Sequence, residues 1–261
     1  MKKKKRFDIA FLLGGTFLVT LIQLYIIPLR GAYVPTFLYF VVPTIYLIWN
    51  YRLNIKKIVA GSLLIGILIP LSFDLLVQLN GSWFVPYDKL LIPFKLFGFY
   101  PVDEIIWFFF LAAYTLVFYE VFVDDEKIRK LSKNFKKGVA VWVVAILLTF
   151  VAILFFRNSL FVPYSYLVVF APFSIPPIIY VIWRKPRLIR KFTLPTAFFF
   201  FVALNFEIVG LTFGDWVFNS QYVGWFSAFG RFFPFEELFY WMLLYPATAL
   251  SYYELFVDDG K

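Results

Sequence analysis

Pro101-Val102-Asp103-Glu104 and Pro234-Phe235-Glu236-Glu237 are two copies of one short acidic motif, and each opens a run of aromatic and aliphatic residues. The two copies lie 133 residues apart. The runs behind them end in Phe122-Val123-Asp124-Asp125 and Phe256-Val257-Asp258-Asp259, which lie 134 residues apart. The chain is therefore predicted to be a tandem duplication, with one repeat in residues 1–130 and a second in 131–261. The same spacing of 133 relates Asp74 to Glu207, Gly81 to Gly214 and Trp83 to Trp216.

The composition indicates a membrane protein. Hydrophobic residues make up 62% of the 261 residues, charged residues only 16%, and the mean hydropathy is +0.81. A soluble domain is about half apolar and a quarter charged. Apolar runs recur between short charged loops, and their length fits the roughly 20 residues that an α-helix needs to cross a bilayer. We expect an all-α, polytopic integral membrane helical bundle.

The absence of cysteine and histidine limits the chemistry. It removes disulfides, thiol catalysis, thiolate or imidazole metal sites and any imidazole acid or base. Carboxylates, hydroxyls and cations remain, and no metal is expected. The formal charge of +9 does not predict nucleic-acid binding, because the basic residues lie in short loops between the apolar runs, where membrane orientation explains them.

Eight spans are expected, four in each repeat. The prediction is weakest for the first span in each repeat, so a bundle of seven helices remains an alternative. The charged Lys2 to Arg6 segment resembles the start of a signal peptide, but the apolar run behind it is too long and lacks a small-residue cleavage pattern. The expected spans are Phe7–Leu29, Tyr33–Trp49, Ile58–Leu79, Pro101–Val123, Val139–Phe156, Pro163–Trp183, Phe192–Thr212 and Pro234–Val257.

The distribution of Lys and Arg gives the orientation. With eight spans and the N-terminus inside, 20 of the 25 Lys and Arg residues fall on the inner side, as the positive-inside rule requires. We expect a multi-pass protein of the cell membrane with both termini cytoplasmic. An even number of spans also gives the two repeats the same orientation. The five basic residues on the outer side are Arg30, Lys89, Lys95, Arg157 and Arg231.

The acidic motifs are the strongest candidates for chemistry. Proline favours the first helical turn because it has no N–H to leave unpaired, so each motif places its carboxylates at a helix start. Side chains three and four residues further along lie on the same helix face. Each acid is thus expected against an aromatic wall. The wall residues are Trp107 and Phe108 beside Glu104, and Tyr240 and Trp241 beside Glu237.

Two further acids, Asp74 and Glu207, lie inside apolar runs, where a carboxylate usually marks a functional or paired site. The outer segments Asn80–Tyr100 and Phe213–Phe233 each begin with a Gly-x-Trp element and are predicted to be interfacial or re-entrant. Simpler explanations remain open: the motif acids are stabilised by the helix dipole at the interface, and the tryptophans form an ordinary aromatic belt. Glu120 and Glu254 are expected to be structural, paired with cations of the inner loops.

The duplicated Pro-x-[Asp/Glu]-Glu motif, the aromatic helices behind it and the Gly-x-Trp segments resemble the integral-membrane lycopene cyclases, in which two small domains occur as separate subunits or as one fused chain. Two departures stand out: Asp103 occupies the position of Glu236, and four helices per repeat exceed the usual three. The resemblance implies an intramolecular lyase, of the isomerase type, that converts linear carotenoid ψ-ends to β-ionone rings without redox change and turns lycopene into γ- or β-carotene.

The resemblance also implies roles for the acids. Glu104 or Glu237 would protonate the terminal alkene, and Asp103 or Glu236 would stabilise the cation or accept a proton. Asp74, Glu207 and the surrounding aromatics, Trp83 and Trp216 among them, would line the substrate site and stabilise the cation. No Gly-x-Gly-x-x-Gly motif is present, so no flavin or other cofactor is expected.

Several alternatives stay open. Another carotenoid end-group enzyme, such as a hydratase or a C50 cyclase, would use the same acids. A non-catalytic carotenoid binder or a transporter would also suit a duplicated bundle with membrane acids. An opsin is disfavoured, because no lysine lies within a predicted span. The expected partners are lycopene and the lipid bilayer, with a second copy of the chain or other enzymes of carotenoid synthesis left open.

Overall fold

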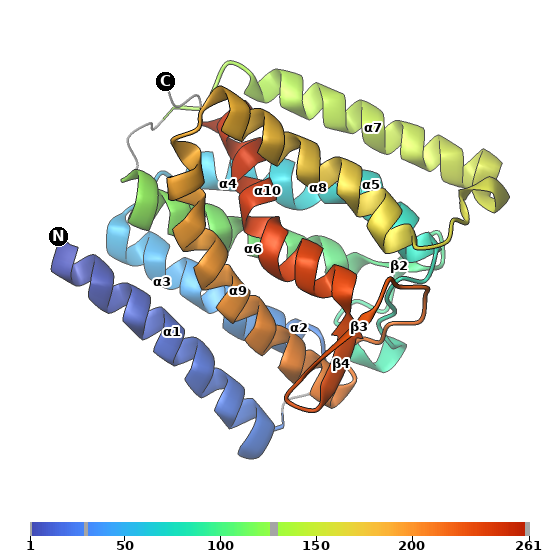
Figure 1. The fold of residues 1–261 in the computed structure, drawn as a ribbon, viewed down its shortest axis with the longest axis horizontal. Coiled ribbons are helices and arrows are strands. Elements are labelled where there is room, and N and C mark those ends of the chain that lie inside the picture. The colour runs from blue at the N-terminus through green and yellow to red at the C-terminus, as the bar shows by residue number, and fades with distance from the viewer. Residues whose placement is uncertain (1, 29–30, 126–129, 259–261) are drawn as a thin grey trace.

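Helices dominate the computed structural model, which describes residues 2–28, 31–125 and 130–258 (Figure 1). They form an all-α bundle with two small β-hairpins at one end. Predictions that fall outside the described residues concern Leu29 of the first span, Asp259 of the second motif and four basic residues, Arg30, Lys127, Arg129 and Lys261.

The first half of the chain contains four helical runs. The first is α1 (Lys2–Tyr25). The fourth run is α6 (Val102–Tyr119) with a π-helical end, Glu120–Asp124. The second and third runs each pass through a π-helical segment: α2 (Tyr33–Thr36), Phe37–Val41 and α3 (Val42–Tyr51), then α4 (Ile55–Leu63), Leu64–Leu68 and α5 (Ile69–Leu79).

The second half repeats this order. It contains α7 (Phe135–Phe156), α8 (Ser165–Arg184), α9 (Leu188–Phe213) and a last run made of a π-helical segment (Glu237–Leu244), α10 (Tyr245–Tyr252) and a π-helical end (Tyr253–Val257). A short 3₁₀ turn, Arg157–Leu160, follows α7, and another, Tyr87–Lys89, lies in the outer segment of the first half.

Prolines explain three of the wide π-helical turns. Pro43, Pro70 and Pro246 stand at the first or second position of α3, α5 and α10, directly after a π-helical segment. Proline offers no N–H to the preceding turn, and its ring crowds the carbonyl four residues back. Each run therefore continues as a helix but widens for one turn before the proline.

Seven of the helical runs are long and apolar enough to cross a membrane. The eighth, Glu237–Val257, is helical but divided between π and α turns. The expected spans are therefore present as helices, with ends displaced by a few residues. The largest displacement is at the N-terminus, where the lysine-rich segment is already part of α1.

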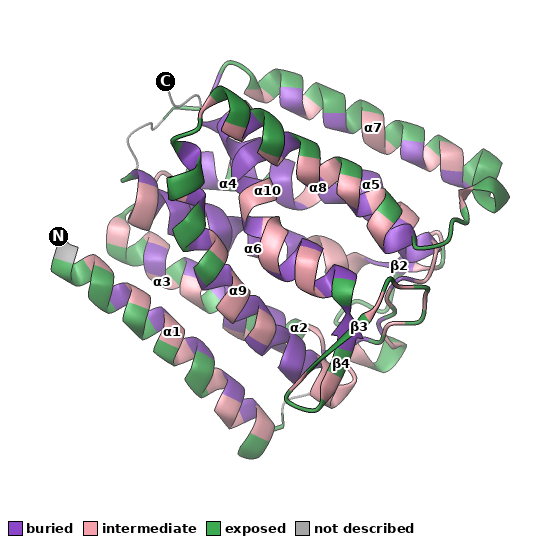
Figure 2. Cartoon of the chain, in the orientation of Figure 1, coloured by how far each residue is buried: buried purple, intermediate pink, exposed green. Residues whose placement is uncertain are grey.

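Many residues of the outermost helices, α1 and α7, are exposed (Figure 2). The α7 run has a mean hydropathy of 3.0, yet only 17% of its most apolar window is buried inside the bundle. α1 likewise exposes Phe7, Phe11 and Phe17. Since water would not stabilise such a surface, the helices indicate a multi-pass membrane protein.

The two halves interlock through their first helices. α1 packs against α9, which belongs to the second half, and α7 packs against α5, which belongs to the first. The Thr20 hydroxyl on α1 donates to the side-chain oxygen of Asn205 on α9 at 2.8 Å. The Thr149 hydroxyl on α7 donates to the carbonyl of Ser72 on α5 at 2.7 Å. Each first helix thus covers the third helical run of the other half.

The two hairpins stand where the outer segments turn back toward the acidic helices. β1 (Lys95–Leu96) pairs with β2 (Tyr100–Pro101), and β3 (Trp225–Ala228) pairs with β4 (Arg231–Pro234), both antiparallel. Gly98 and Gly230 hold positive φ angles of 79° and 74° in the turns, a conformation that glycine adopts without steric cost. α1 begins and the last helical run ends at the opposite end of the bundle (Figure 1).

A short bridge joins the two outer segments. The backbone N–H of Phe84 donates to the carbonyl of Val217 at 2.9 Å, and the N–H of Val217 donates back to Phe84 at 3.0 Å. The two residues lie 133 positions apart, which is the spacing of the acidic motifs. Equivalent positions of the two halves therefore meet each other directly.

Candidate active site

An apolar chamber of about 100 Å³ lies between the two halves, near the hairpin end. Four carboxyl groups line it: Asp103 and Glu104 from α6, Glu207 from α9 and Glu237 from the last helical run. The other lining residues are predominantly apolar: Ala32, Tyr33, Thr36, Trp83, Val85, Leu91, Ile106, Trp107, Phe108, Tyr166, Phe170, Phe206, Trp216, Phe218, Trp241 and Tyr245. Few polar groups in an aromatic enclosure are typical of a site for an apolar ligand.

Glu104 lies in the first turn of α6, as its motif predicts. Pro101 precedes the helix in an extended conformation, with φ −65° and ψ 135°. Trp107, three residues further along, lines the chamber with Glu104. The Trp107 ring lies 4.7 Å from the Trp241 ring, measured between centroids. The aromatic wall beside Glu104 thus includes a residue of the second half.

Glu237 is buried and receives a hydrogen bond from a tyrosine. The Tyr166 hydroxyl on α8 donates to its Oε2 at 2.6 Å. The Tyr166 ring lies 5.1 Å from the ring of Trp83, again between centroids. Trp83 is the tryptophan of the first Gly-x-Trp element. An aromatic residue of the first half thus packs on the tyrosine that binds Glu237 of the second half.

Glu207 is held by the second Gly-x-Trp element. The indole N–H of Trp216 donates to its Oε1 at 2.8 Å, and the Trp216 ring stacks on Phe206 at 4.9 Å. Gly210 leaves the space that the indole fills, since a Cβ built there would lie 2.0 Å from the Trp216 ring. The element is therefore part of the site, and the close approach requires glycine at position 210.

Asp74 lies behind the chamber and not on its surface. It is fully buried, with 0% of its surface exposed, and is absent from the chamber lining. Tyr100 and Gln78 lie beside its carboxyl. Among the described residues, neither Asp74 oxygen has a partner at normal hydrogen-bond geometry. Asp74 is one methylene shorter than its equivalent, Glu207, which reaches the chamber.

A lysine of the first hairpin lies near these acids. Lys95 donates to the carbonyl of Val85 at 3.1 Å, and its ammonium stands 4.3 Å from the ring centres of both Phe84 and Tyr87. Burial lowers the pKa of Lys95, and the nearby charge of Glu104 opposes that effect. Glu104 therefore has a cation nearby.

The motif neighbours, Asp103 and Glu236, bind backbone. Asp103 accepts hydrogen bonds from the N–H groups of Leu91 and Ile92 at 2.5 and 3.0 Å. Glu236 accepts one from the N–H of Val223 at 2.7 Å. Both carboxylates thus anchor an outer segment to the start of its acidic helix.

Nine of the twelve residues predicted for the site line the chamber, and three do not: Asp74, Glu236 and Tyr240. Tyr240 was expected on the Glu237 face, three residues along an α-helix. The segment Glu237–Leu244 is π-helical, and its wider turn aligns residues about one position further apart than an α-helix does. Trp241 therefore faces the chamber, while Tyr240 packs beside Phe170, with ring centres 6.0 Å apart.

Sequence reasoning missed six aromatic wall residues: Tyr33, Tyr166, Phe170, Phe206, Phe218 and Tyr245. A signal for one pair was present, because Tyr33 and Tyr166 lie 133 residues apart, the spacing of the acidic motifs. The same spacing of 133 relates Phe170 to Phe37 and Phe206 to Phe73, so a signal was present for these two as well.

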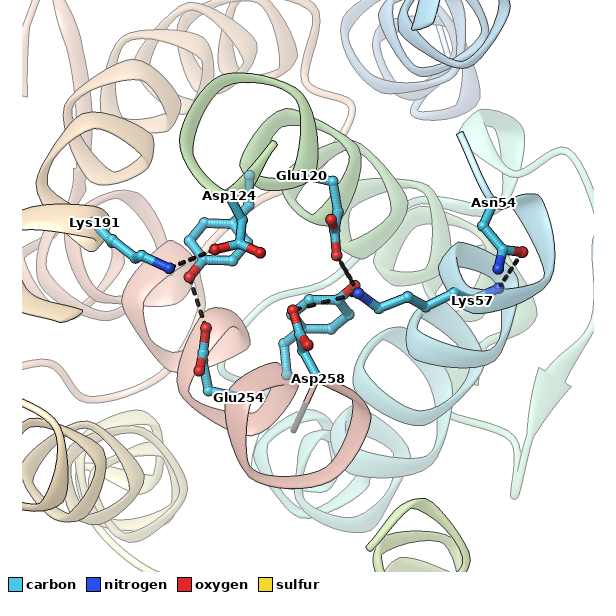
Figure 3. A network of polar contacts seen from close by, with 9 residues as sticks. Asn54, Lys57, Glu120, Asp124, Lys191, Glu254 and Asp258 are labelled. Atoms are coloured by element: carbon cyan, nitrogen blue, oxygen red, sulfur yellow. Dashed lines mark hydrogen bonds and ion pairs between the residues drawn. The ribbon is translucent and has the colours of Figure 1, made fainter. Parts of the chain in front are cut away.

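A second polar cluster lies at the opposite end of the bundle (Figure 3). Lys57, only 2% exposed, is bonded to Glu120 at 2.6 Å and paired with Asp258 at 3.3 Å. The Tyr253 hydroxyl also donates to Glu120. A buried cation from the first half thus joins acids of both halves.

The same arrangement recurs with the halves exchanged. Lys191 pairs with Asp124, and the Tyr119 hydroxyl donates to Glu254 at 2.7 Å. Lys185 adds a cation 3.5 Å from Glu254. These contacts confirm that Glu120 and Glu254 have cationic partners. They also place Lys57 and Lys191 in the first turns of α4 and α9, although both were predicted to lie in inner loops.

Within the described part of the chain, no group of three or more Asp and Glu side chains is arranged to hold a metal ion. The chain was compared with protein-family models, with curated proteins and with solved structures, and none of the three comparisons found a match.

Proposed function

We propose that the chain is a multi-pass membrane enzyme that cyclises the ψ-ends of a linear carotenoid, in the manner of a lycopene β-cyclase. One observation carries the proposal: Glu104 and Glu237 face a common apolar chamber walled by tryptophan and tyrosine. An acid that protonates an alkene must be kept from water, and the resulting cation needs electron-rich surroundings. The chamber supplies both conditions.

The reaction requires only carboxyl groups. A carboxyl O–H protonates the terminal double bond and leaves a tertiary carbocation. The neighbouring double bond attacks that cation, which forms the ring C–C bond and moves the positive charge into the ring. A carboxylate then removes a ring proton, and a new double bond forms. One proton passes from one carboxyl group to another, the substrate keeps its mass, and no electrons are transferred.

The aromatic wall has a defined part in this scheme. The faces of Trp107 and Trp241 offer negative quadrupole density to a cation, worth up to about 2 kcal/mol when water is excluded. Glu207, held by Trp216, adds a further carboxyl oxygen to the wall, and Asp74 lies behind it. The ring C–C bond therefore forms in a site that is complementary to positive charge.

A same-orientation duplication in the cell membrane is part of the proposal. The reciprocal ion pairs of Lys57 and Lys191, and the bridge between Phe84 and Val217, support two equivalent halves. The basic residues favour cytoplasmic termini, in agreement with the start of α1 and the end of the last helical run, which both lie away from the hairpins (Figure 1). Reporter fusions at each terminus test this: a reporter active only outside the cell would contradict the orientation.

The test of the reaction is pigment analysis in cells that make lycopene. Wild-type chain should yield products of unchanged mass and shifted retention. Glu104→Gln and Glu237→Gln keep the shape of the side chain and remove the acid, so each should lower the rate by about 10²–10⁴-fold. Glu236→Gln is the matched control, since it removes the same charge beside Glu237 but outside the chamber.

The same measurement separates the rival functions. A hydratase would add the mass of water, and a C50 cyclase would leave lycopene unchanged but act on a longer carotenoid. A binder would retain pigment without converting it, in the wild-type chain and in both glutamine variants. Unchanged lycopene beside well-inserted wild-type protein would contradict the proposed activity.

A further inference from the structure

We infer that the two halves build one reaction chamber that takes one end of the polyene at a time, through a mouth between α2 and α6. This inference rests on the proposed function and extends it, because a duplicated chain allows two alternatives. In the first, each half serves its own end of the substrate in its own chamber. In the second, both halves act together on one end, and the two ends enter a single chamber in turn.

The walls of the chamber belong to both halves. Glu104 and Glu237 line it together. Trp107 of the first half meets Trp241 of the second at 4.7 Å, and Trp83 of the first meets Tyr166 of the second at 5.1 Å. Because the aromatic contacts cross the boundary, removing either half would remove one side of the enclosure. The two acids therefore serve one space.

The chamber is not symmetric, and two tyrosines show where it opens. Tyr33 and Tyr166 occupy equivalent positions, 133 residues apart. Tyr166 is 2% exposed and covers Glu237 with its hydrogen bond. Tyr33 is 43% exposed, and Glu104 is half-buried whereas Glu237 is buried. The chamber is thus closed beside the second-half acid and open beside the first-half acid.

The mouth lies on an apolar surface. Leu91, a lining residue, is 55% exposed, and Ile106 on α6 is half-buried beside it. On the helical run that carries Tyr33, Phe37 exposes 54% of its surface. In a bilayer these side chains would meet lipid chains, so a polyene dissolved in the membrane reaches the chamber without crossing water. The occupant that fits such a mouth is an elongated apolar chain whose reactive end enters first.

The size of the chamber indicates whether one end of the carotenoid or both ends can occupy it at the same time. Its volume of about 100 Å³ is well below the roughly 300–1,000 Å³ of pockets that enclose a whole drug-sized molecule. A carotenoid is longer still, so only its end group is enclosed and the rest of the chain stays in the mouth and the surrounding lipid. The second end reaches the acids only after the first has left, and the singly cyclised carotenoid is a released intermediate.

The first test is the product distribution over time in lycopene-producing cells or membranes. With one chamber, Glu104→Gln and Glu237→Gln each lower both ring closures in the same ratio, and neither variant stops at the monocyclic product. With two chambers, one variant or both would accumulate monocyclic carotenoid as the final product, which would overturn the inference. If wild-type chain makes no cyclic product at all, the proposed function fails first, and this outcome is distinguishable from the other.

The second test addresses the mouth. Ile106→Trp fills the opening and should slow both ring closures equally. Phe239→Trp is the matched control, because Phe239 occupies the equivalent position in the second half, 133 residues on, and does not line the chamber. Equal slowing by both variants, or no effect of Ile106→Trp in correctly inserted protein, would contradict this position of the mouth.

A binding measurement gives a readout apart from turnover. Lycopene quenches tryptophan fluorescence when it enters a chamber walled by indoles, and the Glu104→Gln chain in detergent binds without converting it. Titration should reach saturation at one polyene per chain, and Ile106→Trp should weaken it. Saturation at two polyenes per chain would contradict a single chamber.

Discussion

The Tyr119 hydroxyl donates to Glu254 at 2.7 Å, across the boundary between the two halves. The residues 134 positions on or back, Tyr253 and Glu120, make the same contact in the opposite direction. A hydrogen bond and its exchanged copy place both tyrosines and both acids at the contact between the last helical runs of the two halves. The second polar cluster, drawn in Figure 3, therefore joins the two halves. It lies at the end of the bundle opposite to the chamber.

Lys57→Met tests how far this cluster stabilises the bundle. Lys57 is buried between Glu120 and Asp258, and removing one partner of a buried ion pair typically costs about 3–5 kcal/mol because a charge is left uncompensated. Unfolding in mixed detergent should show a loss of this size. Lys56→Met is the control, since Lys56 is exposed. An equal, small effect of both substitutions would mean that the pair contributes little.

The pH dependence of stability should report on Asp258, which lies just beyond the last helix. Burial raises the pKa of Asp258 above its usual 3.8, and Lys57 opposes the rise. The folded chain thus binds this proton more tightly than the unfolded chain does. The resulting stabilisation is fully present below 3.8 and is lost as the pH rises through the raised value.

Asp258→Asn should remove that contribution. The free energy of unfolding, followed from about pH 3.5 upward, should then fall less steeply with rising pH in the variant than in the wild-type chain. Identical slopes would show that the carboxyl titrates alike in the folded and unfolded states.

Gly210→Ala should disturb the hydrogen bond of Glu207. The new methyl group would overlap the Trp216 indole, which must then move away from Glu207. Overpacking of this kind costs about 1–3 kcal/mol, and the emission of Trp216 should shift. Gly14→Ala on α1 is the matched control, because nothing lies within 4 Å of its added Cβ. Unchanged emission in Gly210→Ala would show that the indole keeps its place.

Asp103→Asn separates anchoring from chemistry. The substitution removes the negative charge that holds the N–H groups of Leu91 and Ile92, and hydrogen bonds to charged groups contribute about 1.5–3 kcal/mol. We expect faster proteolysis within residues 80–100 and a moderate loss of ring closure, smaller than in Glu104→Gln. Full loss of activity with unchanged proteolysis would show that Asp103 takes part in the reaction and does not act only as an anchor.

Much of the fold could be predicted from the sequence, because long apolar runs indicate membrane helices. All eight expected runs are helical. The packing of α1 against α9 could not be predicted from the sequence, because the apolar surface of α1 does not specify which helix it contacts. The pairing depends on side chains that lie 185 residues apart, Thr20 and Asn205.

The site was predictable where the duplication marked it and less so elsewhere. Glu104, Glu237 and Glu207 were candidate site residues and all line the chamber, but the sequence left open whether the two repeats form one site or two. The position of Tyr240 was wrong because a π-helical segment changes which residues share a face, and Pro246 was not recognised as the sign of that segment. The asymmetry between Tyr33 and Tyr166 depends on packing between helices and therefore required the structure.

The crossed packing of the first helices has a consequence for synthesis. α7 is made after its partner α5, but α1 is made long before α9, which begins about 160 residues after α1 ends. At about 5–20 residues per second, α1 waits on the order of 10–30 s without the helix that it packs against. During that interval Thr20 lacks its Asn205 acceptor. The ribosome therefore makes the two halves one after the other. Neither half can complete its packing until α9, the third helical run of the second half, has left the ribosomal tunnel.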